Sequence, residues 1–421
     1  MHKLRLLLKH NDFLRHNAIF WVASLGVSFL NYLYYPVMGR LLDPASFGET
    51  QTVISIITQT ATFLQVLGLV SVTIITKYED KEYREKLGNE LSRLTLMFSV
   101  ISLTAVILFS PLLKNFFHFY STAPFFILAA SLLVSVPVSF ANAYLQGHKR
   151  FGTLAISNVL GGVTKLLFSI GFVLLGFKTI GAVGGLVAAQ LLTLIYALNK
   201  GRGIKHFVAG NLHLKRPDIQ LIKPELPFTL MVLATSITTN LLLSFDILVV
   251  KHFFPPAQAG LYTGISIISN IIFYLCGPFA SVLVPSLKPG AAAKANLMLL
   301  KRSLLLTGGL GGIVLIMFLA VPHLIVTILL GHTYALYSQY LRGLGGSIYA
   351  LSLANVLILY HIALRHFLVA PTVLVGLVTT LLLLSQFHAT IGSVVNDLLT
   401  GGIVLLLALT GLTIGYRPKQ A

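Results

Sequence analysis

Hydrophobic stretches long enough to cross a lipid bilayer alternate with short polar segments along this chain. A membrane-spanning helix needs roughly 20 predominantly apolar residues, and twelve stretches come close to or exceed that length. The pattern therefore predicts twelve membrane helices. They are Asn17–Leu42, Phe47–Ile75, Leu91–Leu112, Ala123–Gln146, Gly152–Gly176, Ile180–Leu198, Pro227–Val250, Gly260–Val284, Ser303–Leu330, Tyr337–Leu364, Phe367–Ser385 and Val394–Tyr416.

A short phrase from the first half of the chain returns in the second. Pro44, Ala45 and Gly48 align without a gap with Pro256, Ala257 and Gly260, and an isoleucine-rich run follows each phrase. Internal repeats are typical of transporters whose substrate site lies between the repeats. With six spans in each repeat, both halves have the same orientation, so an axis along the membrane normal should relate them.

These patterns predict an all-α integral membrane protein of two six-helix lobes with pseudo-two-fold symmetry. The composition agrees, because the 421 residues are 56% hydrophobic and only 10% charged, with a mean hydropathy of +0.87. The expected parts are a basic cytoplasmic segment (1–16), an N-terminal lobe (17–199), a cytoplasmic linker (200–226), a C-terminal lobe (227–416) and a cytoplasmic tail (417–421).

The net charge of +18 follows from topology rather than from nucleic-acid binding. Of the 30 basic residues, 24 fall in or at the edge of alternate inter-span segments, or at the two termini. Cytoplasmic loops carry such an excess of lysine and arginine. We therefore expect both termini in the cytoplasm, and we expect neither a cleaved signal nor a nucleic-acid partner.

Active-site and metal motifs of soluble proteins are missing from the sequence. There is one cysteine, Cys276, and the 13 histidines show no ligand spacing. We therefore expect no catalytic residues, no cofactor and no metal. A membrane polymerase or ligase would want a sizeable outer loop with clustered Arg, His or carboxylates, and the expected outer loops are too short for one.

Two cations inside apolar spans are candidates for substrate binding. Lys165 lies near the middle of its span without an acidic neighbour in sequence, and such a group usually faces a bundle interior or a wet cavity. A lysine can also extend its side chain to the interface. Arg342 is a weaker candidate, because it lies only a turn or two inside its span and could mark the interface.

Two acidic residues have structural explanations. Asp246 lies near the outer end of its span, where pairing with Lys251 is plausible, although a coupling role is open. Asp43 and Arg40 bracket the turn after the first span, where a local ion pair or a helix cap is expected.

Amide side chains are the remaining candidates for a polar cavity. Each is by itself best explained by hydrogen bonding between helices. Together, however, Asn31 and Gln59 in the first half and Asn240 and Asn270 in the second give both halves polar groups in their first two spans. A cavity of amides, hydroxyls and a few cations suits a sugar that carries a phosphate.

Two segments resemble a known family. The first runs from Asn31 to Pro44 (NYLYYPVMGRLLDP) and continues with Phe47 and Gly48. The second is Tyr144–Gly147 followed by Arg150 and Phe151. Both are similar to signatures of polysaccharide-biosynthesis flippases in the multidrug/oligosaccharidyl-lipid/polysaccharide (MOP) exporter superfamily.

This resemblance implies a non-enzymatic transporter that works by alternating access. Its substrate would be a polyprenyl-(pyro)phosphate-linked oligosaccharide, moved across the cytoplasmic membrane for surface polysaccharide synthesis. The partners that it implies are membrane lipid and a polysaccharide polymerase or glycosyltransferases. Cationic cavity residues of such flippases are thought to engage the pyrophosphate, a role that Lys165 and Arg342 could fill. A multidrug or cation antiporter of the same superfamily is the alternative.

Overall fold

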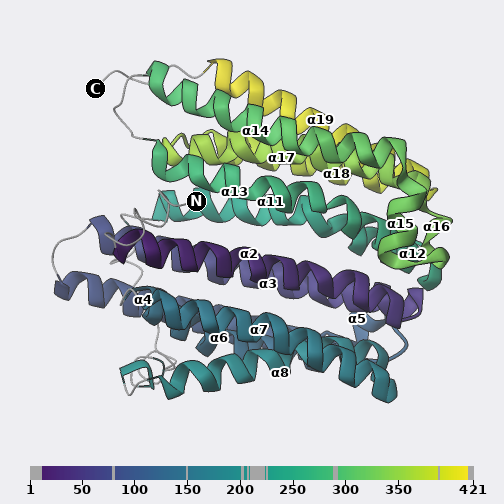
Figure 1. Cartoon of the computed structure of the whole chain (residues 1–421), viewed down its shortest axis with the longest axis horizontal. Coiled ribbons are helices and arrows are strands. Elements are labelled where there is room, and N and C mark those ends of the chain that lie inside the picture. Colours follow the sequence, from purple (N-terminus) through teal and green to yellow (C-terminus); the bar gives the residue numbers. More distant parts are fainter. Residues whose placement is uncertain are drawn as a thin grey trace, which may run out of the picture. The chain divides into compact units, whose positions relative to one another are not determined.

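The computed structural model describes residues 12–77, 81–147, 150–200, 203–205, 208, 223, 226–287, 293–386 and 389–415 (Figure 1). Within these ranges the regular elements are all helices, joined by short turns. The predicted all-α class is therefore confirmed. Most of the expected N-terminal segment, central linker and C-terminal tail lies outside the described residues.

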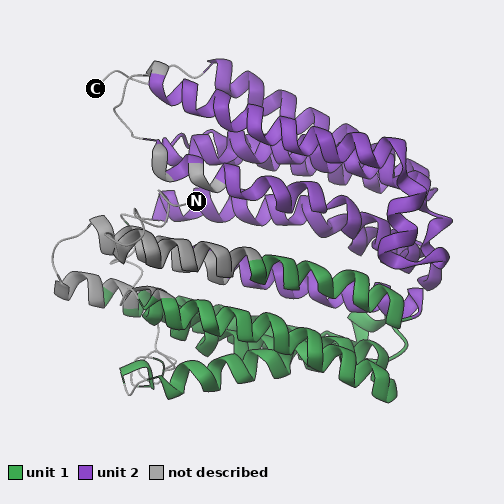
Figure 2. Cartoon of the chain, viewed as in Figure 1, with its two compact units in different colours: residues 1–42, 67–223 green, residues 43–66, 224–421 purple. Residues whose placement is uncertain are grey.

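The chain forms two compact units, coloured separately in Figure 2. Unit 1 comprises residues 1–42 and 67–223. Its helices are α2 (Asp12–Leu41), the second part of α3 (Pro44–Lys77), α4 (Lys81–Leu108), α5 (Ser110–Phe116), α6 (Ala123–Gly147), α7 (Phe151–Phe172), the π-helical turn η1 (Val173–Phe177) and α8 (Lys178–Asn199). Buried apolar side chains from α4, α6, α7 and α8, among them Leu96, Phe140, Leu145 and Leu154, form one core of this unit.

Unit 2 comprises residues 43–66 and 224–421. Besides the first part of α3, it contains α11 (Leu226–Phe253), α12 (Pro256–Ser269), α13 (Ile271–Ser286), α14 (Ala293–Ala320), α15 (Pro322–Leu330), α16 (His332–Ala335), the 3-10 turn η3 (Ser338–Tyr340), α17 (Leu341–Ala363), α18 (Val369–Gln386) and α19 (Ile391–Gly415). The units differ from the predicted lobes in residues 43–66, which come from the first half of the sequence. The predicted lobe boundaries stay a prediction.

Eight helical segments of the described chain are long and apolar enough to cross a membrane, or nine if the bent pair α4–α5 is one span. One of the eight, Gly152–Asn199, contains both α7 and α8. These spans show a multi-pass membrane protein, and twelve remains the predicted number.

Two predicted spans are interrupted, which corrects the sequence interpretation. The span predicted at Leu91–Leu112 bends by 65° between α4 and α5. The span at Ser303–Leu330 breaks at Val321, because Pro322 has no N–H to continue the helix and begins α15 instead. The span predicted at Gly260–Val284 is not interrupted in this way, because Asn270, where α12 meets α13, keeps a helical conformation and Pro256–Ala280 forms one candidate span.

The turn between α7 and α8 depends on a glycine. Gly176 has a φ of +91°, a conformation that side chains with a Cβ rarely adopt. Beyond this turn the two helices pack closely, and the Ser169 hydroxyl of α7 donates a hydrogen bond of 2.9 Å to the Ala182 carbonyl of α8. The gap between the predicted spans Gly152–Gly176 and Ile180–Leu198 lies at this position.

The two echoed phrases contact each other within unit 2. A Cβ built on Gly48 would lie 3.0 Å from the Cα of Gly260, and a Cβ on Gly260 would overlap the carbonyl oxygen of Pro44. The beginnings of α3 and α12 therefore approach so closely that only glycine fits at position 260. The repeat seen in the sequence is thus also a packing contact, which explains why residues 43–66 group with unit 2.

Candidate functional site

Lys165 lies in the second half of α7 and contacts α2. Its ammonium nitrogen donates a hydrogen bond of 2.8 Å to Oδ1 of Asn31 and lies 4.5 Å from the ring centroid of Tyr34. The Tyr34 side chain is fully buried, and its hydroxyl donates to the Ala182 carbonyl at 3.1 Å. A fixed aromatic face and an amide oxygen therefore hold the lysine between α2 and α7.

The charge of Lys165 has only neutral partners among the described residues. Its hydrogen bond is to an amide and its second contact is a cation–π interaction, which contributes about 0.5–2 kcal/mol. A cation on an apolar helix usually has a countercharge or a water-filled space beside it. Lys165 is half-buried, and its role as a substrate-binding cation stays a prediction.

Arg342 has a different setting from Lys165. It lies in the first turn of α17, immediately after the η3 turn, and its side chain is exposed. This position fits the alternative of an arginine that marks a helix end. Its role as a substrate-binding cation stays a prediction.

The amide candidates divide between the two units. Asn31 is in unit 1 with Lys165, whereas Gln59, Asn240 and Asn270 are in unit 2, around α11. Gln59 donates to the Ser244 hydroxyl of α11 at 3.0 Å, and Asn270 donates to the Leu243 carbonyl at 3.3 Å. Both are hydrogen-bonding residues between helices.

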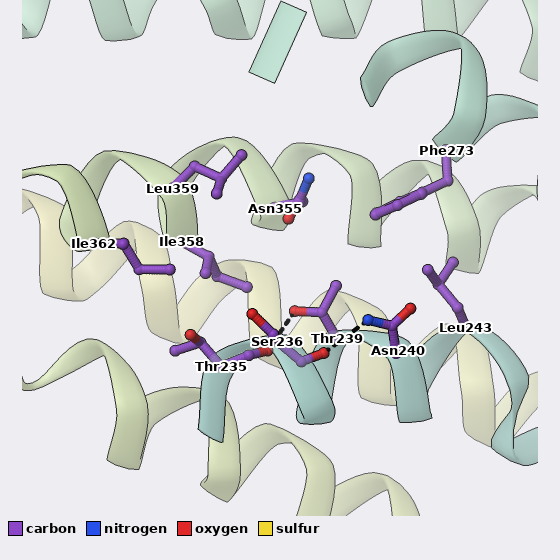
Figure 3. Close-up of a pocket in the computed structure, with 10 residues that line it drawn as sticks. All are labelled: Thr235, Ser236, Thr239, Asn240, Leu243, Phe273, Asn355, Ile358, Leu359 and Ile362. Carbon is purple, nitrogen blue, oxygen red and sulfur yellow. Dashed lines mark hydrogen bonds between the residues drawn. The ribbon is translucent and has the colours of Figure 1, made fainter. Parts of the chain in front are cut away.

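Asn240 differs from the other two because it lines a pocket. The pocket has a volume of about 160 Å³ and lies among α11, α13 and α17 (Figure 3). Asn240 donates from Nδ2 to the Ser236 carbonyl at 3.0 Å, one turn earlier in α11. The ten lining residues are Thr235, Ser236, Thr239, Asn240, Leu243, Phe273, Asn355, Ile358, Leu359 and Ile362.

Asp246 is enclosed by hydroxyl donors from α12. The Tyr262 hydroxyl donates to its Oδ2 at 2.9 Å, and the Ser266 hydroxyl donates to the same oxygen. The predicted partner, Lys251, is five residues further along α11 and therefore faces another side of the helix. The structure instead places the charge of Glu49 near Lys251, and both of these side chains are buried. The predicted Asp246–Lys251 pair is thus not the contact that the structure shows.

The turn after α2 contains a helix cap. Asp43 Oδ1 accepts a hydrogen bond of 2.9 Å from the Ser46 N–H, and Oδ2 accepts one of 2.8 Å from the Ser46 hydroxyl. With Pro44 at the first position of α3, this is a standard N-terminus, the capping role expected for Asp43. Arg40 is exposed in the last turn of α2. Burial raises the pKa of the nearby Tyr334 phenol in α16, and the charge of Asp43 raises it further.

The sequence interpretation missed several residues. Tyr34 was visible only as part of an aromatic run, Glu49 as a single acid at the start of a span, and Asp397 as a single acid in the last span. The structure buries Glu49 and Asp397. Acidic residues inside predicted spans are a usable signal, since burying a charge is costly in a membrane. No group of three or more metal-binding side chains occurs within the described part of the chain.

Solved structures with the same fold are transporters. The structure described as "Lipid II flippase MurJ, inward closed conformation" aligns with a TM-score of 0.73 and 14% identity, covering 96% of this chain and 89% of that one. An inward-facing multidrug resistance MATE transporter of the MOP superfamily aligns with a TM-score of 0.68 and 14% identity, over 94% of this chain and 99% of that one. An outward-facing multidrug resistance MATE transporter of the same superfamily aligns with a TM-score of 0.61 and 16% identity, over 93% of this chain and 95% of that one.

Sequence similarity assigns the chain to one family. A comparison with curated proteins finds no significant match. A family model described as "Polysaccharide biosynthesis protein", however, matches residues 14–288, well over half of the chain. With the fold of MOP-superfamily transporters and this match, the chain belongs to the polysaccharide biosynthesis protein family.

Proposed function

We propose that this protein is a flippase that moves polyprenyl-(pyro)phosphate-linked oligosaccharides across the cytoplasmic membrane. The observation that carries the proposal is Lys165, a cation on an apolar helix whose described contacts, Asn31 and Tyr34, are both neutral. A (pyro)phosphate is the anion that such a substrate would bring to the ammonium. The family supports the oligosaccharide part of the substrate.

Alternating access is the proposed mechanism of transport. MATE transporters with this fold have been solved in inward-facing and outward-facing conformations. The excess of basic residues in alternate inter-span segments supports an orientation with both termini in the cytoplasm. Glycosyltransferases that build the oligosaccharide and a polymerase that consumes it are the proposed functional partners.

A multidrug or cation antiporter is the competing function, because MATE transporters share the fold. Antiport would need an acidic group that binds a cation during the cycle. Asp246 is enclosed, with its described hydrogen bonds coming from Tyr262 and Ser266. This arrangement favours a structural role for Asp246 and thereby the flippase.

Reconstitution into liposomes tests the proposal. A fluorescent polyprenyl-pyrophosphate oligosaccharide is placed in both leaflets, and the fraction that an external glycosidase can reach is followed over time. We expect the protein to make the inner pool accessible, whereas liposomes without protein should not. No acceleration of lipid movement, together with proton- or sodium-driven export of a cationic dye, would replace the flippase by the antiporter.

A further inference from the structure

The pocket among α11, α13 and α17 is built differently from the lysine site. Four of its lining residues carry hydroxyl or amide groups on α11, and Asn355 on α17 adds another amide (Figure 3). The other lining residues are Leu243, Phe273 and three residues of α17, all apolar. No lining residue is charged, so this site has no means of neutralising an anion or a cation.

The polar groups of α11 mainly offer hydrogen-bond acceptors to a ligand. The hydroxyl protons of Thr235 and Thr239 are directed to the carbonyls of Met231 and Thr235, both at 2.8 Å. Asn240 uses its Nδ2 on the Ser236 carbonyl. What remains free on these three side chains is mostly oxygen lone pairs, which accept but do not donate, together with the second N–H of the Asn240 amide.

Asn355 and Ser236 complement these acceptors. Neither the Asn355 amide nor the Ser236 hydroxyl makes a hydrogen bond to another described residue, so both can donate and accept. Figure 3 shows Asn355 on the opposite wall from Ser236 and Thr239, with Phe273 toward one end of the pocket. A small ligand here would be held from two sides and would meet one aromatic ring.

We propose that this pocket is a subsite for one neutral sugar residue, with Asn355 and Thr239 as its main hydrogen-bonding groups. A sugar presents several O–H donors, and an N-acetyl sugar adds an N–H donor, which matches the acceptors of α11. Its C–H edges carry partial positive charge and fit the negative face of the Phe273 ring. The inference deepens the proposed function, since it names the part of the oligosaccharide that unit 2 would recognise.

A lipid tail or a bare metal ion fits this pocket less well. A hydrocarbon chain would leave the acceptors of Thr235, Thr239 and Asn240 without partners, which is unfavourable in a partly dry site. A sodium ion would use neutral oxygens of this kind, but a pocket of about 160 Å³ is much larger than one ion. The sodium ion is kept as an outcome of the test.

Binding of free N-acetylglucosamine to the full chain in lipid nanodiscs tests the subsite without the lipid. Saturation-transfer NMR with a sugar titration gives the dissociation constant. For Asn355→Leu and for Thr239→Val we expect a two- to tenfold loss of affinity each, as for one lost hydrogen bond. Thr239→Val keeps the side-chain shape, so it guards against a folding defect.

Asn396→Leu and Thr400→Val on α19 are matched controls. They make the same changes outside the pocket, and Thr400 makes the same type of bond to the carbonyl four residues earlier, at 2.8 Å. Both should bind the sugar like the unaltered protein. Equal losses in the pocket and control variants, or no loss in either, would overturn the subsite. Displacement of the sugar by sodium, with no effect of Asn355→Leu on sugar binding, would overturn it in favour of an ion.

Transport and free-sugar binding, measured on the same protein, separate the subsite from the proposed function. If the unaltered protein does not move the lipid-linked oligosaccharide but still binds the sugar through Asn355, the flippase proposal fails and the subsite stands. If the lipid moves but Asn355→Leu changes neither sugar binding nor transport, only the subsite fails.

Discussion

Lys165 in unit 1 and Asp246 in unit 2 are both ionisable groups on apolar helices, yet their surroundings differ. Asp246 is almost completely buried and accepts two hydrogen bonds from α12, whereas Lys165 is half-buried and contacts an amide and an aromatic ring. The hydroxyl donors satisfy one carboxylate oxygen inside the protein. The lysine keeps a charge that no described partner neutralises. Neutral groups contact both charges, so the two residues differ in burial rather than in neutralisation: Asp246 is enclosed, whereas Lys165 is only half-buried.

Removing the charge of Lys165 should have the largest effect on transport. A hydrogen bond to a charged group contributes about 1.5–3 kcal/mol, so Lys165→Ala should lower the transport rate by roughly 10- to 100-fold. Lys165→Arg keeps the charge with a different shape and should retain part of the activity. The liposome assay measures both rates. Normal transport by Lys165→Ala would remove the cation site while leaving the fold assignment unchanged.

Giving Lys165 an internal countercharge should weaken its attraction for an anion. Asn31→Asp would place a carboxylate at the position 2.8 Å from the ammonium, where it would compete with a phosphate. We expect about a tenfold weaker binding of polyprenyl pyrophosphate, since an opposed charge offsets about one charged hydrogen bond.

Asn31→Ala is the control for that variant. It removes only the amide contact, so binding should weaken less than in Asn31→Asp. A titration of the lipid against each variant in nanodiscs gives the affinities. Unchanged binding in Asn31→Asp would contradict a phosphate site at Lys165.

The comparison also shows what could be predicted from the sequence. Lys165 could be found, because one lysine in the middle of an apolar run is visible without a structure. Its partner could not, because Asn31 is 134 residues away and many amides occur in the spans. Asp246 was visible too, but its predicted partner was the nearest cation in sequence rather than the hydroxyls of the next helix.

The fold shows the same limit. Apolar length predicted the helical class and most spans, since each span depends on local composition. The break at Val321 and the bend between α4 and α5 occur within predominantly apolar runs, so hydropathy gave no sign of them. The echoed phrases revealed a repeat, but not that Gly48 and Gly260 would lie in contact.

Close packing at the start of α12 should determine the stability of the region that holds Asp246. Gly260→Ala would press a Cβ against the Pro44 carbonyl, and overpacking of this kind costs about 1–3 kcal/mol. Since α12 carries Tyr262 and Ser266, the strain acts on the helix that holds Asp246. The lone cysteine, Cys276, is buried, so a thiol-reactive dye reports the thermal transition.

Gly277→Ala on α13 is the matched control. A Cβ there would meet no atom within 4 Å, and alanine is the better helix former by about 1 kcal/mol. It should therefore leave the transition unchanged or raise it. Equal transition temperatures for Gly260→Ala and Gly277→Ala would show that the contact of the two phrases is looser than the structure indicates.

Neutralising Asp246 should have the smallest effect. In Asp246→Asn one amide oxygen can still accept from Tyr262 and Ser266, so the stability should change by no more than about 1 kcal/mol, the value of one ordinary hydrogen bond. The transport rate should stay within about threefold of that of the unaltered protein, because a threefold change corresponds to less than about 1 kcal/mol of activation free energy.

Asp246→Leu is the contrasting variant, since it leaves two buried hydroxyls without their acceptor and should destabilise the protein by about 2 kcal/mol or more. A stable Asp246→Asn protein that has lost transport together with proton or sodium uptake would reverse the comparison. Asp246 would then be the coupling group and the protein an antiporter.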